Sequence, residues 1–405
     1  MIDLPTNDPL TNDASLTSEP VAPIAVVTTP PQDKVAETKP DDSSGRNRKK
    51  ILFVGGLVLM IITLVGLVGY FMYQRGTKQN GVSKTNANAK IVIGFSMGTL
   101  QEERWQRDRD EFVKETDRLG VALNLLSSNN NAELQLQQAR NLIAQKVDVL
   151  VIAPYDADSI APAVSEAQAA GIKVISYDRL IRGADVDLYV SFDNKEVGRQ
   201  EAQGVINVVN KGRFAYIGGS LTDNNALLLK EGSMEVLQPY IDSGEIKLVY
   251  EEFTADWKPE NAYSNLKGFL QKNSPVDAVI AANDGTAFGS IKALTEYGLV
   301  NIPVSGQDAE LSACQRVVEG TQTMTVYKPI PKLVQTVVAE AIKMASGETP
   351  EVTSYVNNGN SEIPSNLIRP TSVTKDNMMT TVISDGYHSY DEVYANVPSE
   401  LRPEQ

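Results

Sequence analysis

The chain has 405 residues, of which 42% are hydrophobic and 22% charged, as expected for a folded protein with one or two sizeable cores. Its formal net charge of −14 argues against a nucleic-acid partner, because phosphate binding needs a basic surface. A single cysteine and a single histidine exclude a disulfide framework, a multi-cysteine metal site and most histidine-based catalysis. We therefore expect no metal and no cofactor.

The first fifty residues differ in composition from the rest of the chain. They contain seven prolines before Ser44 and no aromatic residue, so residues 1–50 are predicted to be a disordered tail. Residues 51–73 follow as 23 consecutive residues without a charge. As a helix this stretch would measure about 34 Å, which is long enough to cross a bilayer.

We interpret residues 51–73 as a retained transmembrane anchor helix. The alternative is a cleavable signal peptide, because Ala87-Asn88-Ala89 resembles a cleavage site, although it lies 14 residues beyond the apolar stretch. Basic residues crowd the N-terminal side of the stretch, so the positive-inside rule predicts a cytoplasmic tail and an extracytoplasmic domain. Residues 74–89 then form a linker, and we expect a single-pass protein of the cell membrane.

From Lys90 onward, short apolar runs alternate with amphipathic helical patterns, which predicts βαβ units and parallel sheets in an α/β fold. The predicted strands lie near residues 90–96, 121–126, 148–153, 172–177, 213–218, 246–251, 277–281 and 302–305. Helical periodicity is clearest over residues 132–146 and 330–346. The pattern breaks near Tyr189 to Asn194, and a second series begins after Lys211.

Two such series in one chain predict two doubly wound lobes with a ligand cleft between them. We assign residues 90–191 and 328–355 to the first lobe, and residues 192–327 and 356–388 to the second. The chain then crosses between the lobes three times and forms a hinge. Residues 389–405 are expected to be a C-terminal tail.

Polar clusters close or follow the predicted strands, and strand ends are where α/β proteins bind ligands. Carboxylates, guanidinium groups and carboxamides hydrogen-bond vicinal hydroxyls, and flat indole rings stack on apolar sugar faces. This set suits a small polyhydroxylated molecule better than a phosphate, a metal or a duplex. The candidate binding residues are Arg104, Trp105, Asp178, Arg179, Asp223, Asn225, Trp257, Asn283, Asp308 and Lys328.

Several of these residues also fit structural roles, and the sequence leaves both interpretations open. Arg104 and Trp105 fit a solvated helix face with one buried tryptophan. Asp178 and Arg179 fit a structural ion pair, and Asp223 fits a helix N-cap. Trp257 fits a hydrophobic contact at a helix start.

A hydrolase is the competing enzymatic interpretation. Residues 94–98 match the G-x-S-x-G nucleophile motif, and Asp178 or Asp308 with His388 would follow in hydrolase order. The match is weak, because Ser96 closes the first strand of the domain, whereas that fold places several strands before its nucleophile. We expect no enzymatic activity.

The domain resembles the bacterial periplasmic D-xylose-binding proteins of the type I sugar-binding family over roughly residues 90–388. The motifs that carry the resemblance are KIVIGFSM, ERWQRDRDEF, VDVLVIAPYDAD, GIKVISYDRLI, YVSFDNKEVG, IGGSLTDNNA, LQPYIDSGEIK, DWKPENA, AANDGTAFG, SGQDAEL and GTQTMTVYKPI. The resemblance implies the type I periplasmic-binding-protein fold, no catalysis, and a monosaccharide bound by the ten candidate residues. It implies hydrogen bonds from the eight polar ones and stacking by Trp105 and Trp257.

Two features depart from that family. The first loop, residues 98–101, is uncharged where relatives tend to be charged, so we expect no sugar contact from it. The predicted anchor is the second departure, because relatives are usually freely periplasmic or lipid-anchored. We therefore expect sugar delivery to an ABC permease, with signalling to a membrane histidine kinase as the alternative.

Overall fold

The computed structural model describes residues 81–84, 91–273 and 275–404. The predicted tail and anchor helix lie outside these residues, as does most of the predicted linker. Within the described ranges, no helix combines the length and apolarity needed to cross a bilayer. Residues 81–84 of the predicted linker form strand β1 (Gly81–Lys84), which pairs antiparallel with β3.

An eight-stranded sheet organises the first lobe, in the order β1-β3-β2-β4-β5-β6-β12-β11. Its strands after β1 are β2 (Val92–Met97), β3 (Ala122–Ser127), β4 (Val149–Ala153), β5 (Lys173–Tyr177), β6 (Leu188–Phe192), β11 (Ser354–Asn357) and β12 (Glu362–Ile368). The six central strands are parallel, whereas the two edge strands β1 and β11 are antiparallel to their neighbours. The predicted strands 90–96, 121–126, 148–153 and 172–177 are confirmed to within two residues.

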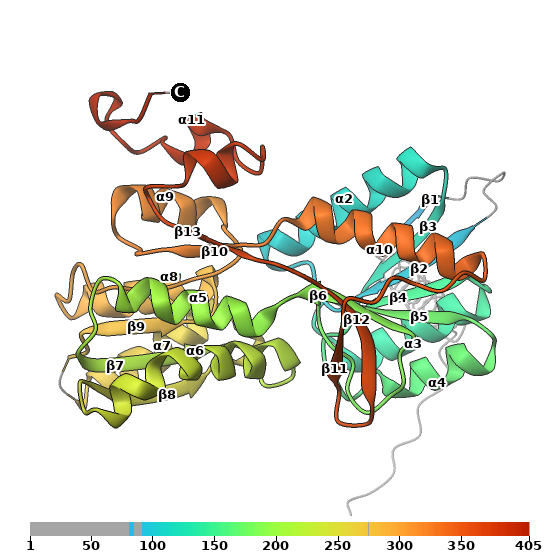
Figure 1. The fold of residues 1–405 in the computed structure, drawn as a ribbon, viewed down its shortest axis with the longest axis horizontal. Helices are drawn as coiled ribbons and strands as arrows, with labels where there is room; N and C mark the ends of the chain where they lie inside the picture. The colour runs from blue at the N-terminus through green and yellow to red at the C-terminus, as the bar shows by residue number, and fades with distance from the viewer. Residues whose placement is uncertain (1–80, 85–90, 274, 405) are drawn as a thin grey trace, which may run out of the picture. The chain divides into compact units, whose positions relative to one another are not determined.

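Helices cover both faces of this sheet (Figure 1). Apolar side chains of α2 (Glu103–Leu119) and α10 (Ile330–Ala345) pack on one face, and those of α3 (Ala132–Ala144) and α4 (Ala161–Ala169) pack on the other. The helical periods at 132–146 and 330–346 are thus confirmed. Parallel strands with both faces covered are almost entirely apolar, as the five buried residues of β4 illustrate.

The second lobe repeats this plan around a three-stranded parallel sheet, in the order β8-β7-β9. Its strands are β7 (Gly212–Gly218), β8 (Ile246–Phe253) and β9 (Ala278–Ala281). Two helices pack on each face, with α5 (Asn194–Ile206) and α6 (Asn224–Asp242) opposite α7 (Pro259–Leu270) and α8 (Asp284–Glu296). A two-stranded sheet of β10 (Thr325–Tyr327) and β13 (Thr371–Val373) adjoins it.

The predicted strand at 302–305 does not form as a strand of its own. Val304 makes a single parallel bridge to Val279, and the chain then turns away. The physical reason is Pro303, which lacks the N–H that a ladder requires.

The chain crosses between the lobes at three places: between β6 and α5, between β10 and α10, and between β12 and β13. The assignment of residues 356–388 to the second lobe is wrong for residues 356–368, because β12 pairs in parallel with β6 of the first sheet. The sequence pattern there is Pro- and Asn-rich and carried no signal for a central strand.

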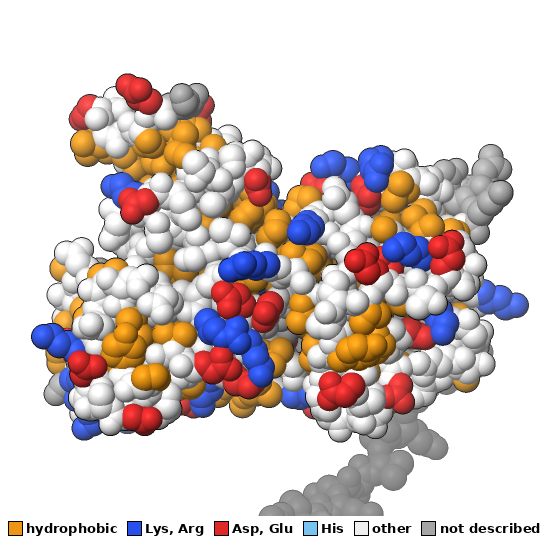
Figure 2. All heavy atoms as spheres, viewed as in Figure 1, with side chains coloured by type: hydrophobic (Ala, Val, Ile, Leu, Met, Phe, Trp, Pro, Cys, Tyr) orange, Lys and Arg blue, Asp and Glu red, His pale blue; other side chains and the backbone are white. Residues whose placement is uncertain are grey.

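Residues 389–404 were expected to be a tail, but they contain α11 (Tyr390–Val393) and a 3₁₀ turn, η3 (Ser399–Leu401). Helix α11 lies beside α9 (Leu311–Glu319) in Figure 1. The side chains of Val393 and Tyr394 are buried. This segment therefore belongs to the folded domain. On the face drawn in Figure 2, acidic and basic side chains are interspersed and do not form a broad basic area.

Candidate functional site

All ten residues singled out in the sequence line one cavity between the two lobes. Arg104 and Trp105 begin α2, Asp178 and Arg179 follow β5, and Lys328 follows β10. The second lobe contributes the other five residues. Asp223 and Asn225 lie at the start of α6, and Trp257 lies in the 3₁₀ turn η1 (Ala255–Trp257). Asn283 precedes α8, and Asp308 lies between α8 and α9. About 320 Å³ of space not filled by atoms, open solvent included, lies between these residues.

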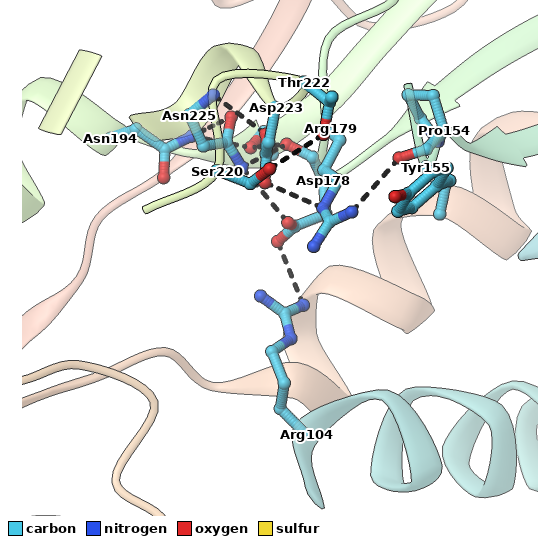
Figure 3. Close-up of polar contacts among 12 residues, drawn as sticks. Arg104, Pro154, Tyr155, Asp178, Arg179, Asn194, Ser220, Thr222, Asp223 and Asn225 are labelled. Carbon is cyan, nitrogen blue, oxygen red and sulfur yellow. Dashed lines mark hydrogen bonds and ion pairs between the residues drawn. The ribbon is translucent and has the colours of Figure 1, made fainter. Parts of the chain in front are cut away.

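Arg104 is the central cation of the site. Its Nη2 lies 3.0 Å from Asp178 Oδ2 and 3.1 Å from Asp108 Oδ2, and its Nη1 lies 3.7 Å from Asp308 Oδ1. Its side chain is buried, so the interpretation of this run as a solvated helix face is wrong for Arg104. Figure 3 shows the guanidinium reaching from α2 toward Asp178. Three carboxylates around one guanidinium fix its position before any ligand arrives.

Asp178 and Arg179 do not pair with each other, so the local ion pair considered from the sequence does not form. Asp178 has a φ of +59°, in the left-handed region of backbone conformation. Its carboxylate points toward Arg104, whereas the side chain of Arg179 points toward Asp223. Arg179 Nε lies 2.8 Å from Asp223 Oδ2 of the second lobe, and its Nη1 donates to the carbonyl of Pro154 (Figure 3). The two residues thus tie α2 to the first sheet and the first lobe to the second.

Two helix starts supply the second lobe's polar groups. Asp223 is both an N-cap and a site residue, since its Oδ1 accepts from Asn225 N at 2.9 Å while Oδ2 faces Arg179. The Asn225 amide donates to Asp178 Oδ1 at 3.3 Å across the cleft. Asn283 caps α8 through its Oδ1, which accepts from Thr286 N and leaves its Nδ2 as a donor at the cavity wall.

The two tryptophans of the chain both line the cavity. The guanidinium carbons of Arg104 and Arg179 lie 4.2 and 5.0 Å from the ring centroid of Trp105. The Trp257 ring lies against the backbone at Gly219, where an added Cβ would be 2.1 Å from ring atom Cη2. A glycine is therefore required under this indole.

The acids of the cavity differ in their pKa values. Burial favours the neutral form of Asp178, but Arg104, Lys328 and Arg179 together hold its pKa below its usual range. Burial dominates at Asp223 and raises its pKa, against the opposing effect of Arg179. Asp178 is therefore an ionised acceptor in the site.

The structure adds Glu102 and Gln307 to the lining, and the sequence reasoning did not select either one. Glu102 precedes α2, and burial raises the pKa of its carboxyl. Gln307 lies within the SGQDAEL motif, directly before the candidate Asp308. The first loop, residues 98–101, does not line this cavity.

Four polar atoms at the cavity wall are buried without a hydrogen-bond partner: Glu102 Oε2, Trp257 Nε1, Gln307 Oε1 and Asp308 Oδ1. They comprise three acceptor oxygens and one N–H donor. Of these, Asp308 Oδ1 lies 2.8 Å from Lys328 Nζ as an ion pair. Buried polar groups are nearly always paired in native proteins, so unpaired ones that converge on one cavity indicate a polar ligand.

Comparison with known proteins agrees with this geometry. Residues 93–349 match the family described as "Periplasmic binding protein domain". The chain is 45% identical to a D-xylose-binding periplasmic protein of Escherichia coli K12 over 310 residues, which are 76% of this chain and 94% of that one. It is 41% identical to a protein of the same name from Haemophilus influenzae over 336 residues, 82% of this chain and 98% of that one. The chain belongs to the type I periplasmic sugar-binding protein family.

Two solved structures with bound sugars support the fold. A solute-binding protein of Clostridium phytofermentans with bound β-D-glucose aligns with a TM-score of 0.69 and 30% identity, over 75% of this chain and 99% of that one. A carbohydrate-transporter solute-binding protein of Chloroflexus aurantiacus in complex with D-glucose aligns with a TM-score of 0.70 and 31% identity, over 74% of this chain and 97% of that one. The predicted type I fold is thus confirmed.

As a periplasmic sugar-binding protein, the chain is a solute receptor and not an enzyme. The hydrolase motif has a structural explanation, because Ser96 is buried inside β2. The His388 ring is engaged elsewhere: its Nε2 lies 2.8 Å from the Ala309 carbonyl and its Nδ1 3.0 Å from Arg107 Nη2. Serine and histidine therefore form no catalytic pair.

Proposed function

We propose that this protein binds a monosaccharide, D-xylose, in the cavity between its lobes and closes around it by hinge motion. The observation that carries this proposal is the convergence of unpaired buried acceptors and a donor on a cavity with two indoles. A pentose offers several hydroxyls, each of which both donates and accepts. The names of the two relatives at 45% and 41% identity support xylose in particular.

In this proposal the polar residues surround the edge of the sugar and the indoles cover its faces. Asp178 accepts hydrogen bonds from sugar hydroxyls, since its lowered pKa keeps the carboxylate ionised. Arg104, Arg179 and Lys328 donate to ring and hydroxyl oxygens, with Asp223, Asn225, Asn283 and Asp308 completing the polar edge and Trp105 and Trp257 stacking on the faces. The newly found Glu102 and Gln307 join the polar edge through their unpaired oxygens.

The decisive experiment is a thermal-shift panel on the full chain, purified in mild detergent, with xylose, arabinose, ribose, glucose and galactose. A ligand that binds only the folded state raises its melting temperature, so the bound aldose gives the largest shift. We expect xylose to give that shift. A larger shift with a hexose would replace xylose in the proposal, and no shift with any aldose would overturn it.

We also propose that residues 51–73 anchor the protein, with residues 1–50 in the cytoplasm and the binding domain outside. The support is the 23-residue stretch without a charge, flanked on its N-terminal side by basic residues. Membranes washed at alkaline pH should retain the full chain and release a variant that lacks residues 1–73. Release of the full chain would contradict the anchor.

The anchored domain delivers its sugar to an ABC permease in the function that we favour. Signalling to a membrane histidine kinase is the second candidate, and the anchor with its N-terminal tail is the feature that favours it. Co-purification of a permease or of a kinase from membranes separates the two. Deletion of residues 1–45 without loss of uptake or signalling would show that the tail is dispensable.

A further inference from the structure

We propose that Tyr155 and Asp256 form a clamp across the cleft that sets the orientation of Trp257 when the lobes close. The proposal rests on the sugar-binding function above and adds a positioning pair to it. Neither residue lines the cavity that we assign to the sugar. Their role is to couple closure of the hinge to the placement of one indole.

The first-lobe side of the clamp is rigid. Tyr155 follows β4, and its backbone N–H donates to Gln135 Oε1 at 2.8 Å. Its backbone also packs tightly on Gly98, where an added Cβ would lie 2.6 Å from Tyr155 N. The hydroxyl is therefore presented from a fixed base.

The second-lobe side is a strained turn. Tyr155 Oη donates to Asp256 Oδ1 at 2.6 Å, and Lys258 Nζ donates to Asp256 Oδ2 at 2.9 Å. Asp256 and Trp257 have φ values of +57° and +59°. Residues other than glycine seldom adopt positive φ values, and this turn contains two of them in succession. Strained backbone of this kind persists where surrounding contacts hold it, and Tyr155 supplies such a contact from the other lobe.

The same first-lobe segment, residues 154–157, also contacts the second-lobe loop on which the indole lies. Ala157 N donates to the carbonyl of Thr222 at 2.9 Å, and Thr222 Oγ1 lies 2.9 Å from Ser220 Oγ, next to the Gly219 backbone under Trp257. Segment 154–157 thus holds both the turn that carries the indole and the loop on which it lies. Closure of the lobes and placement of the Trp257 indole are therefore coupled.

The test measures xylose release by stopped-flow fluorescence of the two tryptophans in the full chain. Tyr155→Phe removes only the hydroxyl, and we expect the dissociation rate to rise about tenfold while the association rate stays within about twofold. Asp256→Asn should act in the same direction. Asp256→Asn keeps an acceptor oxygen but loses the charge, so it should weaken the contact that Tyr155→Phe removes. The double variant should then be no worse than the more affected single variant, because both changes act on one shared contact.

Tyr263→Phe is the matched control, since Tyr263 Oη donates to Glu296 Oε1 at 2.8 Å entirely within the second lobe. Its dissociation rate should equal that of the wild type. An unchanged rate in Tyr155→Phe, or independent effects in the double variant, overturns the clamp. Tyr155→Phe decides the matter alone if Asp256→Asn does not fold. A wild-type chain that binds no aldose overturns the proposed function and the clamp together, whereas an unchanged rate with intact wild-type binding overturns the clamp alone.

Discussion

Replacing Asp178 by asparagine should weaken xylose binding strongly without unfolding the protein. The substitution keeps the shape of the side chain and one carbonyl oxygen, so it creates no cavity, but it removes the charge that accepts a sugar hydroxyl. Arg104 keeps Asp108 as a partner at 3.1 Å, so its guanidinium is not left unpaired. A hydrogen bond to a charged group contributes about 1.5 to 3 kcal/mol. The dissociation constant should therefore rise roughly 10- to 150-fold.

Isothermal titration calorimetry with xylose measures this change, and a thermal melt of the same samples reports folding. Asp110→Asn is the control, because it makes the same change at an exposed carboxylate of α2 that lies outside the cavity and pairs with Arg109 at 2.8 Å. Its affinity should match that of the wild type. Xylose affinity of Asp178→Asn within twofold of the wild type, in a folded sample, would refute the assignment of Asp178 as a sugar acceptor.

Three further outcomes follow from features described above. Gly219→Ala should displace Trp257 and cost about 1 kcal/mol or more of xylose binding in a fluorescence titration, whereas Gly268→Ala, where an added Cβ meets nothing within 4 Å, should bind normally. Burial lowers the pKa of His388 below 6.5, so its neutral form stabilises the fold above about pH 6.5 and this stability is lost as pH falls through the folded-state pKa. Urea unfolding between pH 5 and 8 measures the free energy of unfolding of the wild type and of His388→Gln. This free energy should fall less steeply with falling pH in the variant, and parallel curves for the two proteins would contradict the argument. Burial raises the pKa of Glu201 well above 4.5, so stability is lost above about pH 4.5, by up to about 1.4 kcal/mol per pH unit. Glu201→Gln should remove that loss at pH 8, and an equal pH dependence in both proteins would contradict the burial argument.

The sequence predicted the site better than it predicted the connections around it. Strand ends in parallel sheets converge, so polar residues such as Arg104 and Asp308 could be placed in one cleft from chain order alone. Their partners could not be predicted, because the pairing of Arg179 with Asp223 spans two lobes. Glu102 was missed since its burial depends on the position of the second lobe.

The strand β12 illustrates what periodicity cannot supply. Its residues do not form a continuous apolar run, yet they lie beside β6 in the first sheet. Its place is fixed by the third crossing of the chain, which is a long-range property. The folded C-terminal segment was missed for a similar reason, because α11 is only four residues long and gains its stability from α9.

The crowding of charges around Arg104 constrains how the specificity of this receptor can change. Because Arg104 contacts Asp108, Asp178 and Asp308, a substitution at any one of these positions disturbs the others. Asn283 and Gln307 carry no charge and lie outside that network, although they line the same cavity. Natural drift or laboratory selection toward a different sugar should therefore begin at these two amides, while the charged residues stay fixed.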